Sequence, residues 1–161
     1  MKALFTLFAA TFFGIIVIGI FPPPEPAFSD AGLDEEAIVM HCVDKRYSKA
    51  EHITTLPEGY HFCAAGCAQR FIRSEVTRED FYEDLAELAA KGINLTEVII
   101  VDHRPCKAYE DDSFAAHERN LREAAKMIHR DPRSQRLKVR LYIHDMDAKP
   151  PEKSLQLVRE G

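Results

Sequence analysis

Residues 98–106 read Val98-Ile99-Ile100-Val101-Asp102-His103-Arg104-Pro105-Cys106 and join an apolar strand to two metal-binding side chains. Four aliphatic residues in a row, all of them Val or Ile, are typical of a parallel strand that is buried on both faces. The strand ends on Asp102-His103, so the imidazole of His103 and the thiol of Cys106 are expected at its carboxyl end. This stretch therefore predicts an α/β fold with a functional site at that edge of the sheet.

A second apolar run, residues 36–43, ends at Cys42 in the same way. Two thiolates and one imidazole are the ligand set of a catalytic zinc site, which keeps a fourth position open for water. Asp44 and Arg46 follow Cys42 closely, and a carboxylate held by a guanidinium could orient that water or replace it on the metal. We therefore expect Cys42, His103 and Cys106 to bind one zinc ion, with Asp44 and Arg46 in catalytic roles rather than as a surface ion pair.

The other elements alternate between strand and helix along the chain. Strands are expected at residues 60–66 and 137–143, and the tail after residue 151 either adds an edge strand or stays loose. One helix is expected from a capping box at Thr77 to Gly92, and another from residues 111–113 to about Arg130. This order predicts a three-layer α/β fold with a largely parallel sheet and helices on both faces. In such sheets, ligands bind beyond the carboxyl ends of the strands.

The N-terminal residues 3–21 are apolar and uncharged, and they predict a cleaved export signal or an uncleaved membrane anchor. A proline-rich stretch at residues 21–26 would serve as a stiff spacer in the second case. We therefore divide the chain into residues 1–29, a signal peptide or anchor with its spacer, and residues 30–161, the zinc domain. Both alternatives place the domain outside the cytoplasm, as a periplasmic, secreted or inner-membrane-anchored protein.

Composition limits the partners that this chain can have. It contains 161 residues, enough for one compact domain with its own core. The net charge is −5 and the basic residues form no tract, which argues against a nucleic-acid partner and leaves small or anionic partners open.

The remaining cysteines and histidines allow more than one interpretation. In an oxidising compartment, four cysteines could pair as Cys42–Cys106 and Cys63–Cys67 instead of binding metal. Cys63 and Cys67 are alternatively two buried thiols or a second soft-metal pair.

Asp102 would either support a metal ligand by a hydrogen bond or cap the turn that follows it. Solvated positions on helix or strand faces are expected for three histidines, namely His117, His129 and His144.

The motif Cys-x-Asp-x-Arg at residues 42–46, followed by His-x-x-Cys at residues 103–106, resembles the beta-class carbonic anhydrases. Residues 59–66 look like the second-strand segment of that family, so the resemblance covers roughly residues 36–147. It implies a mixed sheet of order 2-1-3-4, one zinc ion per subunit, and a homodimer. It also implies a lyase that reversibly hydrates carbon dioxide to bicarbonate and a proton by means of zinc-bound hydroxide. Asp44 would accept the hydrogen bond of that hydroxide, and Arg46 would keep Asp44 ionised.

The chain departs from the family pattern at three places. Cys63-Ala64-Ala65-Gly66-Cys67 stands where family members usually have Arg-Asn-Ala-Gly-Asn, which removes polar groups and adds two thiols. Lys107-Ala108 follows Cys106 where family members commonly have Gly-Gly. The added side chains would lie close to the metal pocket and could restrict access of the substrate. The export segment replaces the N-terminal arm that usually embraces a partner subunit, so a homodimer would have to form by another route. The alternatives to a carbonic anhydrase are therefore a non-catalytic zinc-binding or sensor protein, a hydrolase of carbonyl sulfide or carbon disulfide, and an exported thiol protein.

Overall fold

The computed structural model describes residues 37–48, 56–149 and 154–159 of the chain. Its strands are β1 (Ala37–His41), β2 (Tyr60–Cys63), β3 (Glu97–Arg104), β4 (Lys138–Asp145) and β5 (Leu155–Val158). Its helices are the short 3-10 helix η1 (Lys45–Ser48) and the α-helices α2 (Cys67–Arg73), α3 (Glu75–Ala90) and α4 (Phe114–Arg130). Within these ranges no helix is long and apolar enough to cross a membrane. The segment 1–29 lies outside the described residues, so its export role and the division at residue 29 stay predictions.

The five strands form one mixed sheet of order β2-β1-β3-β4-β5. The first four strands are parallel, and β5 runs antiparallel to β4. The predicted order 2-1-3-4 and the antiparallel edge strand are therefore confirmed. Because β1 and β3 are neighbours with His41 opposite Val101, the chain leaves both strands at the same edge of the sheet.

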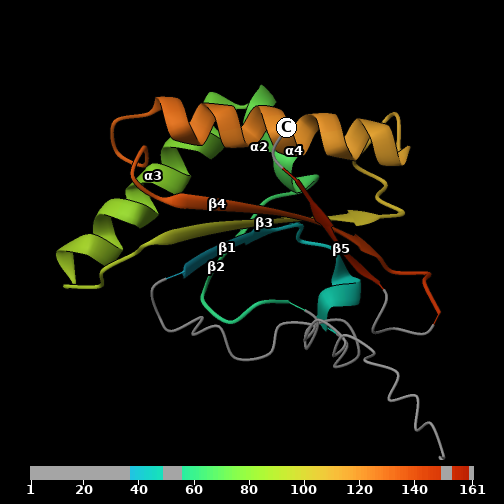
Figure 1. The fold of residues 1–161 in the computed structure, drawn as a ribbon, viewed down its shortest axis with the longest axis horizontal. Coiled ribbons are helices and arrows are strands. Elements are labelled where there is room, and N and C mark those ends of the chain that lie inside the picture. The colour runs from blue at the N-terminus through green and yellow to red at the C-terminus, as the bar shows by residue number, and fades with distance from the viewer. Residues whose placement is uncertain (1–36, 49–55, 150–153, 160–161) are drawn as a thin grey trace, which may run out of the picture.

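The three α-helices α2, α3 and α4 lie together on one face of the sheet, whereas η1 lies on the other (Figure 1). Side chains of a strand alternate between the two faces, so neighbouring residues of β3 point in opposite directions. Asp102 contacts α2 and α4, and His103 contacts the side of η1. Of the helices expected on both faces, the second face carries only η1 within the described part of the chain.

The helix boundaries follow local capping, with one correction. α3 begins two residues before the expected capping box, because the Ser74 side chain, not Thr77, caps it by accepting from the Thr77 amide at 3.2 Å. It ends before Gly92, whose φ of 81° is the left-handed conformation that glycine adopts readily. α4 begins as predicted, with the Ser113 side chain accepting from the Ala116 amide.

Helix α2 was not predicted from the sequence. It follows β2 after Gly66, which is left-handed at φ 75° and allows the chain to turn from strand to helix within three residues. Its buried side chains Ala68 and Phe71 pack into the core, where the Phe71 ring meets the Phe81 ring edge to face at 5.4 Å between centroids. The same short helix brings its N-terminus to the carboxyl ends of β1 and β3, where the candidate site lies.

Candidate metal centre

The structure brings Cys42, His103 and Cys106 together in one buried cluster. One possible ligand atom from each residue lies within 4.8 Å of the other two. Among the described residues, this is the one group of three or more His, Cys, Asp or Glu side chains that could hold a metal ion. Cys42 directly follows β1, His103 is the penultimate residue of β3, and Cys106 lies two residues beyond that strand. Neighbouring parallel strands therefore deliver all three side chains to one point, as their positions in the sequence predicted.

The donor atoms fit a zinc ion. His103 is 1% exposed, and its Nε2 is one of two buried side-chain polar atoms in the described residues that have no hydrogen-bond partner. Burying such an atom unpaired is costly, whereas a metal ion would satisfy it. Two sulfurs and one imidazole nitrogen are donors that zinc prefers, and three protein ligands leave a coordination position free.

A hydrogen bond between Cys42 and Cys106 shifts the pKa values of the two thiols in opposite directions. The pKa of Cys42 is lowered because the Cys106 thiol donates a hydrogen bond to it; burial opposes this effect, and the His103 ring and the Gly66 amide add to it. The Gly66 N–H donates to the Cys42 sulfur at 3.3 Å. The same contact with Cys42, together with burial, raises the pKa of Cys106. One sulfur thus ionises readily, and a bound cation would take the place of the proton between the two sulfurs.

Asp44 and Arg46 form a fork-shaped ion pair beside this cluster. Asp44 Oδ1 accepts from the Arg46 backbone amide and from Nε, and Oδ2 accepts from Nη2, all at 2.9 Å. These bonds hold the pKa of the Asp44 carboxyl well below its usual range, although burial acts in the opposite direction. Arg46 Nη2 also donates to the carbonyl oxygen of Pro105, which lies between the cluster residues His103 and Cys106 in the sequence. The pair is therefore attached to the ligand loop and is not a loose surface contact.

Arg46 leaves one acceptor position of Asp44 unused, on the oxygen near the cluster. A carboxylate offers about four lone-pair positions, of which Arg46 uses three. The oxygen that accepts a single bond, Oδ2, lies 3.7 Å from His103 Nε2. Asp44 can thus accept one further hydrogen bond next to the zinc donors.

Tyr47, on η1, covers the cluster from the second face and was not identified from the sequence. Its buried ring lies 5.8 Å from the His103 ring and 5.2 Å from the His41 ring, between centroids. Its hydroxyl lies 3.2 Å from Nδ1 of His144, which is also buried. The expectation that His144 is solvated is therefore wrong, because η1 covers this part of β4.

His117 is also buried, contrary to the expected solvated position. It is 0% exposed and shares the apolar face of α4 with Leu121, Ala124 and Ile128. That spacing of four, seven and eleven residues was the sequence signal for burial. Asp102 takes neither of its expected roles: its carboxylate accepts from the Ala68 amide at the start of α2 and from the Tyr109 hydroxyl.

All four cysteines are free thiols, so neither of the two alternative disulfides is present. Cys67 is buried, and its thiol donates to the Met40 carbonyl oxygen at 3.5 Å. Cys63 is exposed, with its sulfur 3.2 Å from Nε2 of His41, so the prediction of two buried thiols holds for Cys67 alone.

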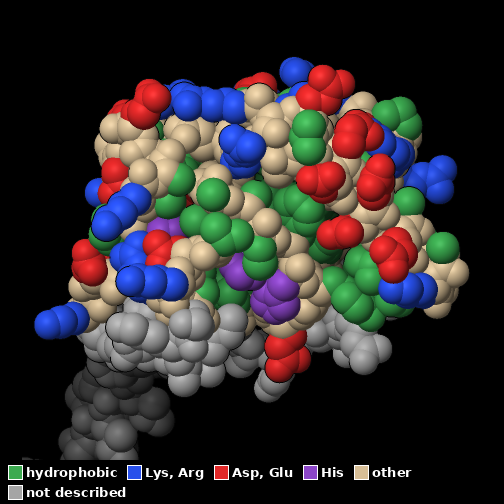
Figure 2. Space-filling view, turned by 180° about the vertical axis from the view of Figure 1, so that it is seen from behind, with side chains coloured by type: hydrophobic (Ala, Val, Ile, Leu, Met, Phe, Trp, Pro, Cys, Tyr) green, Lys and Arg blue, Asp and Glu red, His purple; other side chains and the backbone are tan. Residues whose placement is uncertain are grey.

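The surface around the site carries exposed groups that the sequence had singled out. Lys107 and Ala108 are both exposed and do not fill the cluster. On the face opposite to the view of Figure 1, histidine side chains gather among hydrophobic ones (Figure 2).

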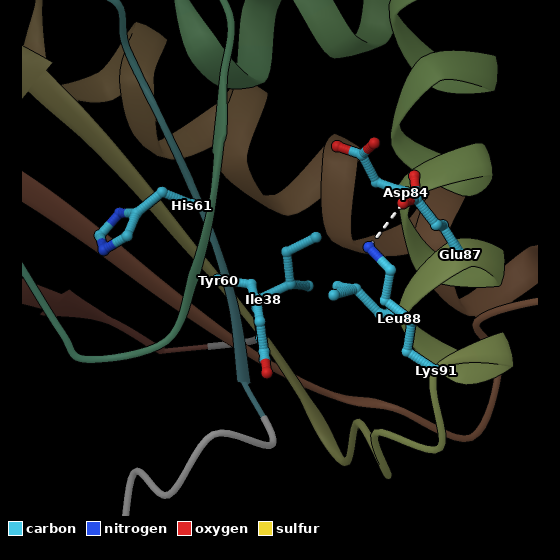
Figure 3. A pocket seen from close by; sticks show the side chains of 7 residues that line it. All are labelled: Ile38, Tyr60, His61, Asp84, Glu87, Leu88 and Lys91. Carbon is cyan, nitrogen blue, oxygen red and sulfur yellow. Dashed lines mark hydrogen bonds and ion pairs between the residues drawn. The ribbon is translucent and has the colours of Figure 1, made fainter.

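A pocket lies apart from the cluster, between strand β2 and helix α3 (Figure 3). His61 belongs to its lining but points away from the other side chains, among them the ion pair of Glu87 with Lys91. None of the five predicted site residues lines this pocket.

No protein-family model and no curated protein matches this chain. Several solved structures resemble it, two of them over about four-fifths of both chains. Carbonic anhydrase from Streptococcus mutans matches with a TM-score of 0.55 and 14% identity, covering 78% of this chain and 82% of that one. Beta-carbonic anhydrase isoform I from Trichomonas vaginalis matches with a TM-score of 0.50 and 12% identity, covering 77% and 82%.

The fold is that of the beta-class carbonic anhydrases. The resemblance predicted from two short motifs thus extends over about four-fifths of the chain. At identities of 14% and 12%, the comparison establishes the fold alone. The chemistry of the site has to be inferred from the residues of the cluster.

Proposed function

We propose that this protein is a zinc-dependent enzyme that reversibly hydrates carbon dioxide to bicarbonate and a proton. The proposal is carried by one observation: an ionised Asp44, held by Arg46, presents a free acceptor position beside three buried zinc donors. Zinc, when bound by Cys42, His103 and Cys106, would supply the Lewis acidity that lowers the pKa of water to about 7.

The chain's own residues would orient the nucleophile. An ionised carboxylate accepts hydrogen bonds and donates none. Asp44 would therefore accept a hydrogen bond at Oδ2 from an oxygen that carries a proton, and so fix the orientation of that oxygen. Arg46 keeps Asp44 ionised through three hydrogen bonds and holds it in place through Pro105. Because Arg46 restrains both carboxylate oxygens, Asp44 would not itself occupy the fourth position of the metal.

A non-catalytic zinc protein is the second candidate, and the tight enclosure of the ligands favours it. Cys42 and Cys106 are each 5% exposed, and the pocket described above lies elsewhere. Carbonyl sulfide and carbon disulfide remain alternative substrates, since the same ligands would serve their hydrolysis.

The test measures zinc content and carbon dioxide hydration on the full-length protein. Stopped-flow turnover that disappears on chelation and returns with zinc would support the enzyme. Zinc bound without turnover of any of the three substrates would leave the non-catalytic protein.

The matched variants are Cys42→Ser and Cys67→Ser. Both cysteines are buried at the carboxyl end of β1 or the start of α2, but Cys67 is not in the cluster. We expect Cys42→Ser to lose zinc and Cys67→Ser to keep it. Wild-type zinc content in Cys42→Ser would contradict the assignment of the ligands.

A further inference from the structure

His117 is held between two carboxylates in the interior of the protein. Its Nδ1 lies 3.1 Å from Asp102 Oδ2, and its Nε2 lies 2.9 Å from Asp112 Oδ1. Each ring nitrogen thus faces a carboxylate oxygen, and only the imidazolium form carries a donor on both nitrogens. Burial alone would lower the pKa of His117, but the hydrogen bonds to Asp102 and Asp112 outweigh it and raise that pKa. The ring of Tyr109 stacks on the His117 ring at 3.9 Å between centroids.

The two carboxylates belong to the segment that carries two of the zinc ligands. Asp102 immediately precedes His103 in β3. Asp112 Oδ1 accepts from the Cys106 backbone amide at 2.9 Å, and the Asp112 carbonyl accepts from Arg104 Nε at 2.7 Å. The same oxygen, Asp112 Oδ1, thus receives both Cys106 N–H and His117 Nε2–H. The His117 ring therefore connects Asp102, the residue before His103, to Asp112, which accepts from the backbone amide of Cys106.

We propose that His117 is a positioning residue that, as an imidazolium between Asp102 and Asp112, holds the loop of His103 and Cys106 in the geometry needed for metal binding. The inference rests on the proposed zinc site. Helix α4 supplies the fixed point, because His117 lies within its first turn and the helix packs on β3 and β4. Groups that orient metal ligands in this way typically contribute about 10–100-fold to metal affinity.

The loop side of this connection offers a conservative and a disruptive variant at the same position. Asp112→Asn keeps a carbonyl oxygen that can accept from both Cys106 and His117, whereas Asp112→Ala removes it. Asp112→Ala leaves the Cys106 amide and His117 Nε2 without this acceptor, whereas the Asp112 side chain itself is 32% exposed, so its removal empties no buried site. His117→Gln is the direct variant, because both donor hydrogens of an amide are on one nitrogen, so its oxygen would face the other carboxylate.

The experiment measures zinc affinity by chelator competition and the absorption spectrum with Co²⁺, whose thiolate and d–d bands report ligand geometry. We expect His117→Gln and Asp112→Ala to weaken zinc binding by about 10–100-fold and to shift the Co²⁺ bands. Asp112→Asn should remain within about threefold of the wild type. Ser134→Ala is the control, because it removes a buried hydrogen bond to the Ile128 carbonyl at the far end of α4.

A purely structural role would lower stability in His117→Gln as in Ser134→Ala and leave zinc affinity and the Co²⁺ spectrum unchanged. That result would overturn the inference. If His117→Gln does not fold, ¹⁵N NMR of the wild type decides, since a neutral His117 ring at pH 7 would equally overturn it. Failure of the wild type itself to bind zinc would refute the proposed function, and this inference with it.

Discussion

Replacing Asp44 by asparagine alters the acceptor beside the zinc donors and leaves the donors intact. An amide has one acceptor oxygen, so Asn at this position could accept from the Arg46 amide and Nε but would then turn its NH₂ group toward Arg46 Nη2. A charge-assisted hydrogen bond of about 1.5–3 kcal/mol in a buried site is lost. The Arg46 and Asp44 side chains are 25% and 19% exposed, which reduces the expected loss of unfolding free energy to about 1 kcal/mol. That corresponds to a decrease in Tm of about 2–4 °C.

The effect of Asp44→Asn on turnover should be much larger than its effect on stability. Removing one preorganised group that acts on the reacting oxygen typically costs about 10²–10³ in kcat. Zinc content should stay at the wild-type value because Cys42, His103 and Cys106 are unchanged. The assay is stopped-flow carbon dioxide hydration, with metal analysis and thermal unfolding of the same samples.

The chain contains its own control for this substitution. Asp131 and Arg133 have the same spacing and the same three hydrogen bonds, from the backbone amide and Nε to Oδ1 at 2.9 Å and from Nη2 to Oδ2 at 2.8 Å. This pair lies beyond the C-terminal end of α4. Asp131→Asn should lose similar stability and keep full turnover. Full turnover in Asp44→Asn, or equal loss in both variants, would refute the role of Asp44.

Three further predictions concern stability. Because the folded-state pKa of Asp44 is lowered, its ionised form stabilises the fold above its unfolded pKa of about 3.9 and loses this effect as pH falls toward the folded value. The stability difference between the metal-free wild type and Asp44→Asn, measured by urea unfolding, should therefore shrink below about pH 4; a difference that grows there would contradict this. Phe71→Ala empties a site that is 0% exposed and should lower the unfolding free energy by about 3–5 kcal/mol, and a loss below about 1 kcal/mol would argue against the packing of α2. Gly66→Ala places a methyl group 3.1 Å from the Ala108 Cβ at a φ of +75°, so thermal unfolding should show a loss of about 1–2 kcal/mol, and an unchanged Tm would show that the turn relaxes freely.

The sequence predicted the strands and the clustering of Cys42, His103 and Cys106 well because both depend on short-range patterns. Continuous apolar runs marked β1 and β3, and the three cluster residues lie at or just beyond the carboxyl ends of these strands, so predicting the strands also placed the cluster. Helix α2 escaped prediction because its seven residues contain no apolar repeat of sufficient length, and its start depends on the left-handed Gly66.

The groups around the ligands could be predicted only in part. Arg46 was placed next to Asp44 by spacing, but its bond to the Pro105 carbonyl joins residues 59 positions apart. The burial of His117 was visible in the helical period, yet its two carboxylate partners come from β3 and from the loop before α4. Pairings of this kind arise from tertiary packing, which a single sequence pattern does not encode.

The alternation of side chains along β3 makes the alignment of that strand a chemical requirement. Asp102 and His103 are adjacent in β3. The Asp102 carboxylate contacts His117 in the helical layer, whereas the His103 ring points to the other face, toward the thiols of Cys42 and Cys106. A slip of one residue against β1 and β4 would exchange the two faces and place a carboxylate among the sulfurs. Eight residue pairs with β4 and five with β1 set this alignment. Single-residue insertions or deletions within β3 should therefore eliminate metal binding even in proteins that still form the sheet.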